Sequence, residues 1–427
     1  MRDEMMTLGT GPDGDLIQLP TSALLRHMVA LGSSGSGKTI LCKVIVEEAV
    51  RKGVPAIVVD PQGDLASLGL MGDPEALIKM GVDPFIAHEY HQLVDVKIWT
   101  PGSSQGIPVN VSPPLRTGNI ERLEDRMRAW ANVGNSLAEM AGYGGAASEC
   151  ARVAFSTILE YADDNRLAID DLNDFSDFLR DPPRALADRL EPIFDQKART
   201  AAEKRFRVKM MGSNRLLFDL GKPIHIDSMF GYEDGGAYDN GKVRVSVVYL
   251  NTLNSFEEKS MFVANLCNSL YQWMLLEAKT RPHGLFYMDE VAPYMPPVRK
   301  PVSKDALMLL LRQARKYGIC MLLATQSPGD LDYKGLSQVG TWALGRIATG
   351  QEIAKVAPAL RADADVDVGE IMERLPGYPA GRFALINASH FDGPQEMDVR
   401  WLVSNHKVLS PEDVESITNE CDRENFG

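Results

Sequence analysis

The sequence predicts an α/β fold with a mostly parallel sheet and an inserted helical region. Short apolar runs of strand length alternate with helical patterns on both sides of the middle of the chain. One of these runs leads through a glycine-rich loop into a helix, and no run of strand length interrupts residues 118–216. Strands that alternate with helices are typical of parallel sheets.

The apolar run His27–Leu31 predicts a short buried strand, and apolar positions 41, 44, 45 and 49 predict a helix directly after the loop. Leu16–Leu19 predicts one strand of a hairpin. Five further buried strands and two later strand candidates are expected at 56–60, 96–100, 243–250, 285–289, 319–324, 343–348 and 383–386.

Residues 118–216 carry helical patterns at 119–141, 146–162, 168–180 and 184–211. We therefore expect four parts. They are a short N-terminal segment (1–25), a core formed by 26–117 and 217–405, a helical insertion (118–216) and a C-terminal tail (406–427).

Composition narrows the class of protein. The chain has 427 residues, 44% of them hydrophobic, and a net charge of -13, so it is not basic all over. Its five cysteines form no C-x-x-C pair, which argues against a zinc site. No signal peptide is visible and no apolar run approaches the ~18 residues that span a bilayer. A cytoplasmic protein without membrane segments is expected.

The stretch from Gly32 to Thr39 has the G-x-x-x-x-G-K-[ST] spacing of a phosphate-binding P-loop. Its place between a strand and a helix suits that role, because loop N–H groups and the helix dipole favour an anion. Lys38 would reach the β- and γ-phosphates, and Thr39 would bind Mg²⁺. The nucleotide-binding residues expected here are Gly32, Ser33, Ser34, Gly35, Ser36, Gly37, Lys38, Thr39 and Ile40.

Asp289 and Glu290 end the apolar run that begins at Leu285, which is a Walker B pattern. Adjacent carboxylates at a strand tip are unfavourable unless a cation neutralises them. Asp289 would hold Mg²⁺, and Glu290 would activate the attacking water as a general base.

Gln326 follows the next apolar run and is a candidate γ-phosphate sensor. Between the two runs, Arg312, Arg315 and Lys316 have a spacing that predicts one basic face on a helix at 303–317. We interpret that face as a source of an arginine finger for a neighbouring subunit, with Arg315 favoured over Arg312; a solvated surface is the alternative.

These motifs resemble the HerA/FtsK superfamily of hexameric DNA-pumping ATPases, and the HerA helicase-like branch most closely. The resemblance rests on the P-loop preceded by Arg26-His27, on Met288-Asp289-Glu290, on ARKYG (314–318) and on LLATQSP (322–328). It covers roughly residues 20–405 without the insertion. It implies a RecA-like core, a homo-hexameric ring with ATP at subunit interfaces, and double-stranded DNA in the pore. It also supports the roles assigned to Lys38, Thr39, Asp289, Glu290, Gln326 and Arg315.

The sequence departs from the family at two places. HerA proteins usually begin with a small β-barrel, whereas about 25 residues precede the core here. The family often has glycine before the finger arginine, where this chain has Ala314.

Two basic clusters are candidates for contacts with DNA phosphates, although either could be a solvated surface. One follows Walker B and contains Arg299, Lys300 and Lys304. The other lies at 197–215 and includes Lys204, Arg205, Arg207 and Lys209.

The sequence thus favours an ATP-driven double-stranded DNA translocase or helicase that requires ATP and Mg²⁺. Two alternatives remain open. One is a nucleotide-dependent ring that activates a partner effector such as a nuclease. The other is a conjugation- or secretion-type motor that moves single-stranded DNA or protein.

Overall fold

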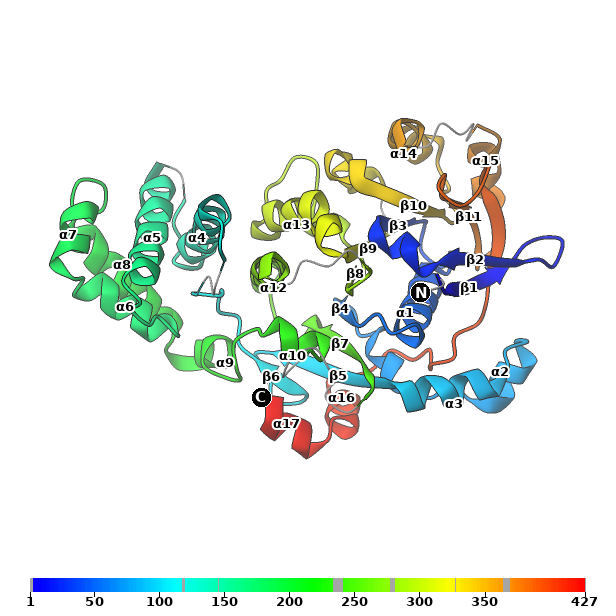
Figure 1. Ribbon diagram of the computed structural model, residues 1–427, viewed down its shortest axis with the longest axis horizontal. Coiled ribbons are helices and arrows are strands. Elements are labelled where there is room, and N and C mark those ends of the chain that lie inside the picture. The colour runs from blue at the N-terminus through cyan, green and yellow to red at the C-terminus, as the bar shows by residue number, and fades with distance from the viewer. Residues whose placement is uncertain are drawn as a thin grey trace.

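One sheet organises the fold (Figure 1). The computed structural model describes residues 3–116, 120–144, 146–232, 241–276, 281–326, 328–363 and 369–426. Within these residues twelve strands pair in the order β2-β1-β12-β11-β10-β3-β9-β8-β4-β7-β5-β6. The pairings from β10 to β6 are all parallel, and those from β2 to β10 are antiparallel. The predicted α/β fold with a mostly parallel sheet is confirmed.

The parallel part contains the buried strands that the apolar runs predict. Its strands are β3 (His27–Leu31), β4 (Ala56–Asp60), β5 (Val94–Pro101), β6 (Ile107–Val109), β7 (Val243–Tyr249), β8 (Gly284–Met288), β9 (Ile319–Thr325) and β10 (Val339–Leu344). The strand expected at 343–348 is placed too late, because β10 ends at Leu344 and a loop begins at Gly345.

The antiparallel part holds the hairpin of β1 (Met5–Thr10) and β2 (Leu16–Pro20), together with β11 (Arg382–Ile386) and β12 (Gln395–Val399). β12 escaped prediction because its sequence QEMDV is polar and only its central methionine is buried. The N-terminal hairpin therefore extends the core sheet through the pair β1–β12.

Helices cover both faces of the parallel strands. Figure 1 shows α1 (Lys38–Arg51) on one side and both α12 (Phe256–Leu276) and α13 (Val302–Gln313) on the other. The predicted helix at 303–317 is too long: α13 ends at Gln313, and Ala314–Tyr317 form a 3-10 turn. Gly318 closes that turn with a φ of 74°, a left-handed conformation that glycine adopts without strain.

The segment after β12 crosses α1 and is anchored by a buried carboxylate. Glu47 is fully buried, and it accepts hydrogen bonds from the backbone N–H groups of Val403 and Ser404. Arg400 completes the anchor with an ion pair of 2.9 Å to Glu47. A buried charge is tolerated when it is paired and hydrogen-bonded in this way. The anchor holds the C-terminal segment against the helix that begins at the P-loop.

Helices occupy the region predicted as an insertion, between β6 and β7. They are α4 (Leu123–Met140), α5 (Ala146–Asp164), α6 (Leu172–Arg180), α7 (Arg184–Leu190), α8 (Gln196–Lys209) and α9 (Arg215–Phe218). Buried aromatic rings form their core, with Phe155 in edge contact with Phe175 and Phe206. The insertion contacts the rest of the fold through α4, where Asn268 of α12 donates to Ser136.

The remaining helices are short and peripheral: α2 (Pro74–Lys79), α3 (Pro84–Leu93), α10 (Ile226–Phe230), α14 (Gly350–Asp363), α15 (Gly369–Arg374), α16 (Pro411–Ile417) and α17 (Glu420–Phe426). None of the helices in the described ranges combines the length and the apolar character needed to cross a bilayer.

The close crossing of α4 and α5 predicts a sensitive glycine. A Cβ atom at Gly134 would lie 2.8 Å from the carbonyl oxygen of Arg152, too close for any side chain. We expect Gly134→Ala to lower the free energy of unfolding by about 1–3 kcal/mol through overpacking, measured by urea denaturation. Gly144→Ala, in the connection between the same helices, is the control because no atom lies within 4 Å of its Cβ position. Equal stability of the two variants would contradict this packing.

Candidate nucleotide site

The predicted P-loop lies at the carboxyl end of β3, directly before α1. Gly37 is the N-cap of α1 and has a φ of 93°. A Cβ atom there would lie 3.0 Å from the backbone nitrogen of Gly381. The loop therefore needs glycine at this position both for its backbone conformation and for its close contact with the β11 side of the sheet.

Lys38 is buried within the loop that it terminates. Its ammonium donates to the carbonyl oxygen of Ser33 at 3.1 Å. Burial lowers the pKa of Lys38, while the negative charges of Asp289 and Glu290 oppose that shift. The ammonium group of Lys38 therefore lies near enough to the two predicted Walker B carboxylates to feel their charge.

Asp289 follows the last residue of β8 and is 8% exposed. Burial, together with the nearby charges of Asp60 and Glu290, raises its pKa to about 6. Such a carboxylate needs a cation to remain ionised in a poorly solvated site. Thr39 and Asp289 supply the oxygen ligands that Mg²⁺ prefers.

The loop also offers a free polar group for a nucleotide. Ser36 is buried, and among the described residues its hydroxyl oxygen has no hydrogen-bond partner. An unsatisfied buried hydroxyl is uncommon and indicates a site that a ligand completes. The donors of this loop and the carboxylates of β8 therefore fit a phosphate group with its magnesium ion.

Glu290 is held by the end of the neighbouring strand β9. Its two carboxylate oxygens accept hydrogen bonds from the Thr325 hydroxyl at 2.9 Å and from the Gln326 backbone N–H at 3.0 Å. Its φ is 45°, a left-handed backbone conformation that costs about 1–3 kcal/mol in a residue other than glycine. Strain of this kind is concentrated at functional sites. The structure thus brings Glu290 and the predicted sensor Gln326 together; Ser327 of the same motif lies outside the described residues.

Asp60 is the last residue of β4, and its carboxylate has a structural role. Its carboxylate accepts backbone hydrogen bonds from Gln62, Gly63, Leu65 and Ala66. It therefore shapes the loop after β4, beside Asp289.

Comparisons with known proteins agree with this geometry. Residues 13–109 match the family model described as the central domain of helicase HerA. The fold is similar to VirB4 of Thermoanaerobacter pseudethanolicus, with a TM-score of 0.56, 12% identity, and coverage of 93% of this chain and 96% of that one. It is also similar to the bacterial conjugative coupling protein TrwB in complex with an ATP analogue, with a TM-score of 0.57, 16% identity, and coverage of 97% and 93%. No curated protein shows a significant match to the sequence.

The match to the HerA central domain lies in the part of the chain that holds the P-loop. The resemblance predicted from the motifs is confirmed. The similarity of fold to VirB4 and TrwB extends over nearly the whole chain.

The two candidate finger arginines lie at the opposite edge of the sheet from the P-loop of the same chain. Arg312 is in the last turn of α13, and Arg315 is in the 3-10 turn that leads into the amino end of β9; both are exposed. Burial, with the positive charge of Arg315, lowers the pKa of His27 at the amino end of β3 to about 4. Seven-residue β9 separates the two edges by about 20 Å. The predicted single helical face is wrong, because α13 ends between the two arginines.

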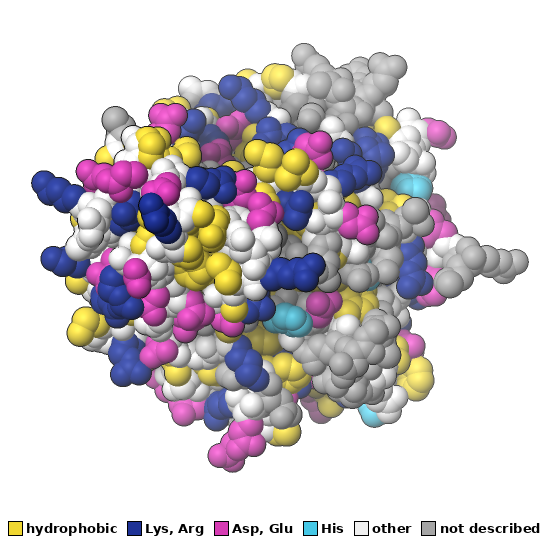
Figure 2. All heavy atoms as spheres, turned by 60° about the vertical axis from the view of Figure 1, so that its left-hand side comes forward, with side chains coloured by type: hydrophobic (Ala, Val, Ile, Leu, Met, Phe, Trp, Pro, Cys, Tyr) yellow, Lys and Arg dark blue, Asp and Glu magenta, His cyan; other side chains and the backbone are white. Residues whose placement is uncertain are grey.

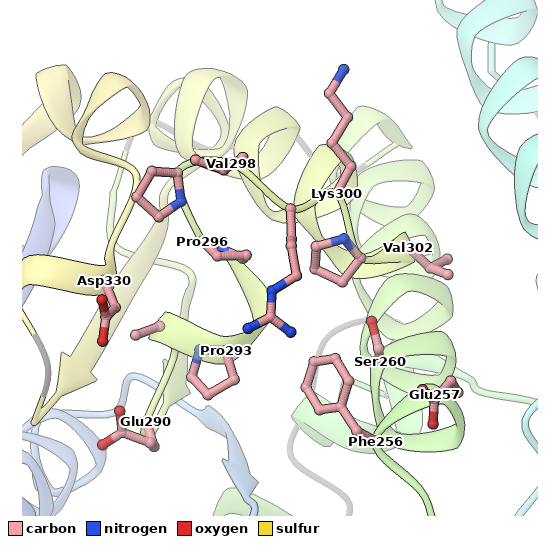
Figure 3. Close-up of a pocket in the computed structure, with 14 residues that line it drawn as sticks. Phe256, Glu257, Ser260, Glu290, Pro293, Pro296, Val298, Lys300, Val302 and Asp330 are labelled. Carbon is pink, nitrogen blue, oxygen red and sulfur yellow. The ribbon is translucent and has the colours of Figure 1, made fainter.

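The basic loop after Walker B divides into exposed and buried parts. Arg299 and Lys300 are exposed, and Lys300 extends away from the cavity beneath the loop (Figure 3). Lys304 is 7% exposed and pairs with Asp332 at 2.8 Å. The expected contact of Lys304 with DNA does not agree with this burial. Lys304 instead ties the loop to the segment after Gln326.

The loop after Walker B covers a cavity of about 940 Å³ next to Glu290, at the carboxyl edge of the parallel strands. Figure 3 shows Glu290 and Asp330 on one side of the cavity and Phe256 and Ser260 of α12 on the other. Lys304 donates to the carbonyl oxygen of Pro297 in the loop. It also forms its ion pair with Asp332, which lies on the segment that contains Asp330. Lys304 therefore connects the loop to the segment that contains Asp330 and Asp332.

The basic cluster of the insertion is partly neutralised. Arg205 stacks on Tyr143 and donates to the carbonyl oxygen of Ala141, while Arg207 pairs with Glu203 and Asp177. Lys204 and Lys209 are exposed. Figure 2 shows acidic and basic side chains interspersed on the side of the molecule that carries the insertion. The pairing of Arg207 with Asp177 was not predictable from spacing, because the two residues are distant along the chain.

Sequence reasoning missed two P-loop neighbours, Arg346 and Gly381. Arg346 lies in the loop after β10, and the Gly381 N–H donates to the carbonyl oxygen of Ser36 at 2.9 Å. A glycine and an arginine directly after an apolar run (LGR, 344–346) were the available signal. This signal was missed because the strand was predicted at 343–348, whereas β10 ends at Leu344.

The two lysines of the post-Walker B loop should behave differently. We expect Lys304→Ala to destabilise the protein by about 2–4 kcal/mol, since it leaves the largely buried Asp332 carboxylate without its partner. Lys300→Ala should change stability by less than about 0.5 kcal/mol, as an exposed surface substitution. Urea denaturation of both variants measures this. Similar free energies of unfolding for the two variants would show that the Lys304–Asp332 pair does not stabilise the fold.

Proposed function

We propose that this chain is an ATP-driven motor that moves DNA and completes its ATP site with a second copy of itself. The observation that carries the proposal is the convergence of the P-loop, Asp289, Glu290 and Gln326 at the carboxyl ends of adjacent parallel strands β3, β8 and β9. Ligands bind at this edge in parallel α/β sheets. TrwB, whose fold is similar, has been solved with ADP and Mg²⁺ and with an ATP analogue.

In this proposal ATP and Mg²⁺ occupy the edge, with Mg²⁺ neutralising charge on the transferred phosphoryl group. Lys38 and the loop N–H groups bind the phosphates. Thr39 and Asp289 would hold the metal ion. Glu290 accepts a proton from the water that attacks the γ-phosphorus, and the products are ADP and inorganic phosphate.

The positions of Arg312 and Arg315 support assembly of the site from two subunits. Both side chains are exposed at the amino edge of the sheet, about 20 Å from their own P-loop. Only another copy can bring such an arginine to the γ-phosphate. A closed ring in which each copy serves the next, such as a homo-hexamer, satisfies this requirement for every site.

Contact with DNA is assigned to the exposed part of the post-Walker B loop. Arg299 and Lys300 are exposed on a loop that starts at the catalytic Glu290. Their contact would be with phosphates and therefore independent of sequence. The HerA match favours double-stranded DNA as the substrate.

The fold similarity to TrwB and VirB4 favours a second candidate, a conjugation- or secretion-type motor that moves single-stranded DNA or protein. The two candidates are separated by stimulation of ATP hydrolysis. Duplex DNA should stimulate the DNA translocase more than single-stranded DNA of equal length. Stimulation by single strands alone would favour the second candidate, and hydrolysis indifferent to all DNA would overturn the DNA assignment.

We expect Lys38→Ala to abolish ATP hydrolysis and Glu290→Gln to retain ATP binding while losing at least about 100-fold in kcat, the contribution of a general base. Phosphate release and equilibrium binding of an ATP analogue measure the two effects. Turnover by Lys38→Ala would refute the assignment of the phosphate loop.

Arg315→Ala should bind ATP normally and lose about 10³-fold or more in kcat. Mixing Arg315→Ala with Glu290→Gln should restore part of the activity, because some interfaces then combine an intact Glu290 with an intact Arg315. Lys316→Ala, exposed in the same turn, is the control. No recovery on mixing, although both variants assemble together, would argue against a finger acting in trans.

A further inference from the structure

Arg346 lies against the P-loop of its own chain, and neither the motifs nor the comparisons assign it a role. It follows β10, which is paired in parallel with β3, so its loop emerges at the same sheet edge as the P-loop. The Gly345 N–H donates to Leu31 at 2.8 Å. The Arg346 carbonyl oxygen accepts from the backbone N–H of Ser33 at 2.7 Å and from the Ser33 hydroxyl at 3.0 Å. The backbone of Arg346 is therefore fixed relative to the loop.

The guanidinium group, in contrast, is only weakly engaged. Its Nη2 lies 3.4 Å from the Ser34 carbonyl oxygen, and its Nε lies 3.5 Å from the Ser33 hydroxyl. Both distances are at the outer limit of hydrogen bonding. Within the described ranges, no carboxylate forms an ion pair with it. A guanidinium has five N–H donors in a planar fork, so most of its bonding capacity is unused here.

The position of this group relative to the loop suggests what it binds. Nη2 lies 4.0 Å from the place that a Cβ atom of Gly35 would occupy. Gly35 has no side chain, and its φ of 72° disfavours one, so the space between the guanidinium and the loop stays open. The residues that it flanks, Ser33 to Gly35, belong to the loop whose N–H groups face the phosphates. Arginine is the side chain best suited to binding a phosphate through two parallel hydrogen bonds.

We propose that Arg346 is a nucleotide ligand in cis, whose guanidinium binds the terminal phosphate of a nucleoside triphosphate beside Lys38. This inference rests on the proposed function, which places a nucleotide in the P-loop. Arg346 is distinct from Arg312 and Arg315, which lie at the far edge of the sheet. Because it belongs to the same chain as the loop, it contributes before any second copy completes the site.

Nucleotide binding by isothermal titration calorimetry tests this assignment. ATPγS and ADP, each with Mg²⁺, are titrated into the full chain carrying Arg346→Gln or Arg346→Lys. The matched control is Arg374→Gln, a half-exposed arginine that pairs with Glu370 and Glu396 and does not contact the loop.

We expect Arg346→Gln to weaken ATPγS binding by about 10- to 100-fold, the usual loss for a charge-assisted hydrogen bond. Its affinity for ADP should change by less than about threefold, and Arg346→Lys should be intermediate for ATPγS because lysine keeps the charge but not the fork. Arg374→Gln should bind both nucleotides as the unmodified chain does.

Two results would overturn the inference. Unchanged ATPγS affinity in Arg346→Gln would show that the side chain does not reach the nucleotide. Equal loss of ATPγS and ADP affinity would show that it supports the loop or contacts another part of the nucleotide; a parallel drop in melting temperature would identify loop support. Failure of the unmodified chain to bind either nucleotide would instead refute the proposed function.

Discussion

The structure depends on a cluster of charges gathered at one poorly solvated edge of a parallel sheet. Lys38 is 6% exposed, Asp289 8% and Asp60 1%, and they follow or end neighbouring segments of the core. Each would be unfavourable alone, because burial disfavours the charged form of every one of them. Asp60 is stabilised by four backbone N–H groups, and Lys38 by the opposing carboxylates. Asp289 accepts one backbone hydrogen bond, from the N–H of Glu290, and its pKa is still raised, so a cation with its anionic ligand would complete the edge.

Much of this edge is predictable from sequence because its chemistry is local. The P-loop spacing fixes a strand, a turn and a helix N-terminus in twelve consecutive residues, from His27 to Lys38. Apolar runs located β4 without error and β8 and β9 within one residue, since buried parallel strands are continuous apolar segments. The carboxyl ends of such strands meet at one edge, and Asp289 and Gln326 were placed there for that reason.

What the sequence could not supply are contacts between residues distant along the chain. Lys304 reads as a member of a basic loop, but Asp332, its partner, lies on another segment. Arg205 is an exposed cation, as its sequence suggests, but its stacking on Tyr143 from the preceding part of the insertion was not predictable. Periodicity also fails where a helix changes type: the apolar spacing of α13 continues through Ala314, although the backbone tightens into a 3-10 turn there. Each of these depends on packing that periodicity does not encode.

The sheet that gathers the charges also separates them from the two candidate finger arginines. α13 starts near the carboxyl edge, after the loop that follows Glu290, and runs back across the face of the sheet to the amino end of β9. It must therefore deliver Arg312 and Arg315 to the far edge, about 20 Å from their own P-loop. The connection between parallel strands imposes this, since every such crossover returns the chain to the amino edge. A subunit with this topology holds phosphate loop and carboxylates on one edge and offers arginines on the other. The same connection that forms the sheet is thus the physical basis for proposing an ATP site shared between copies.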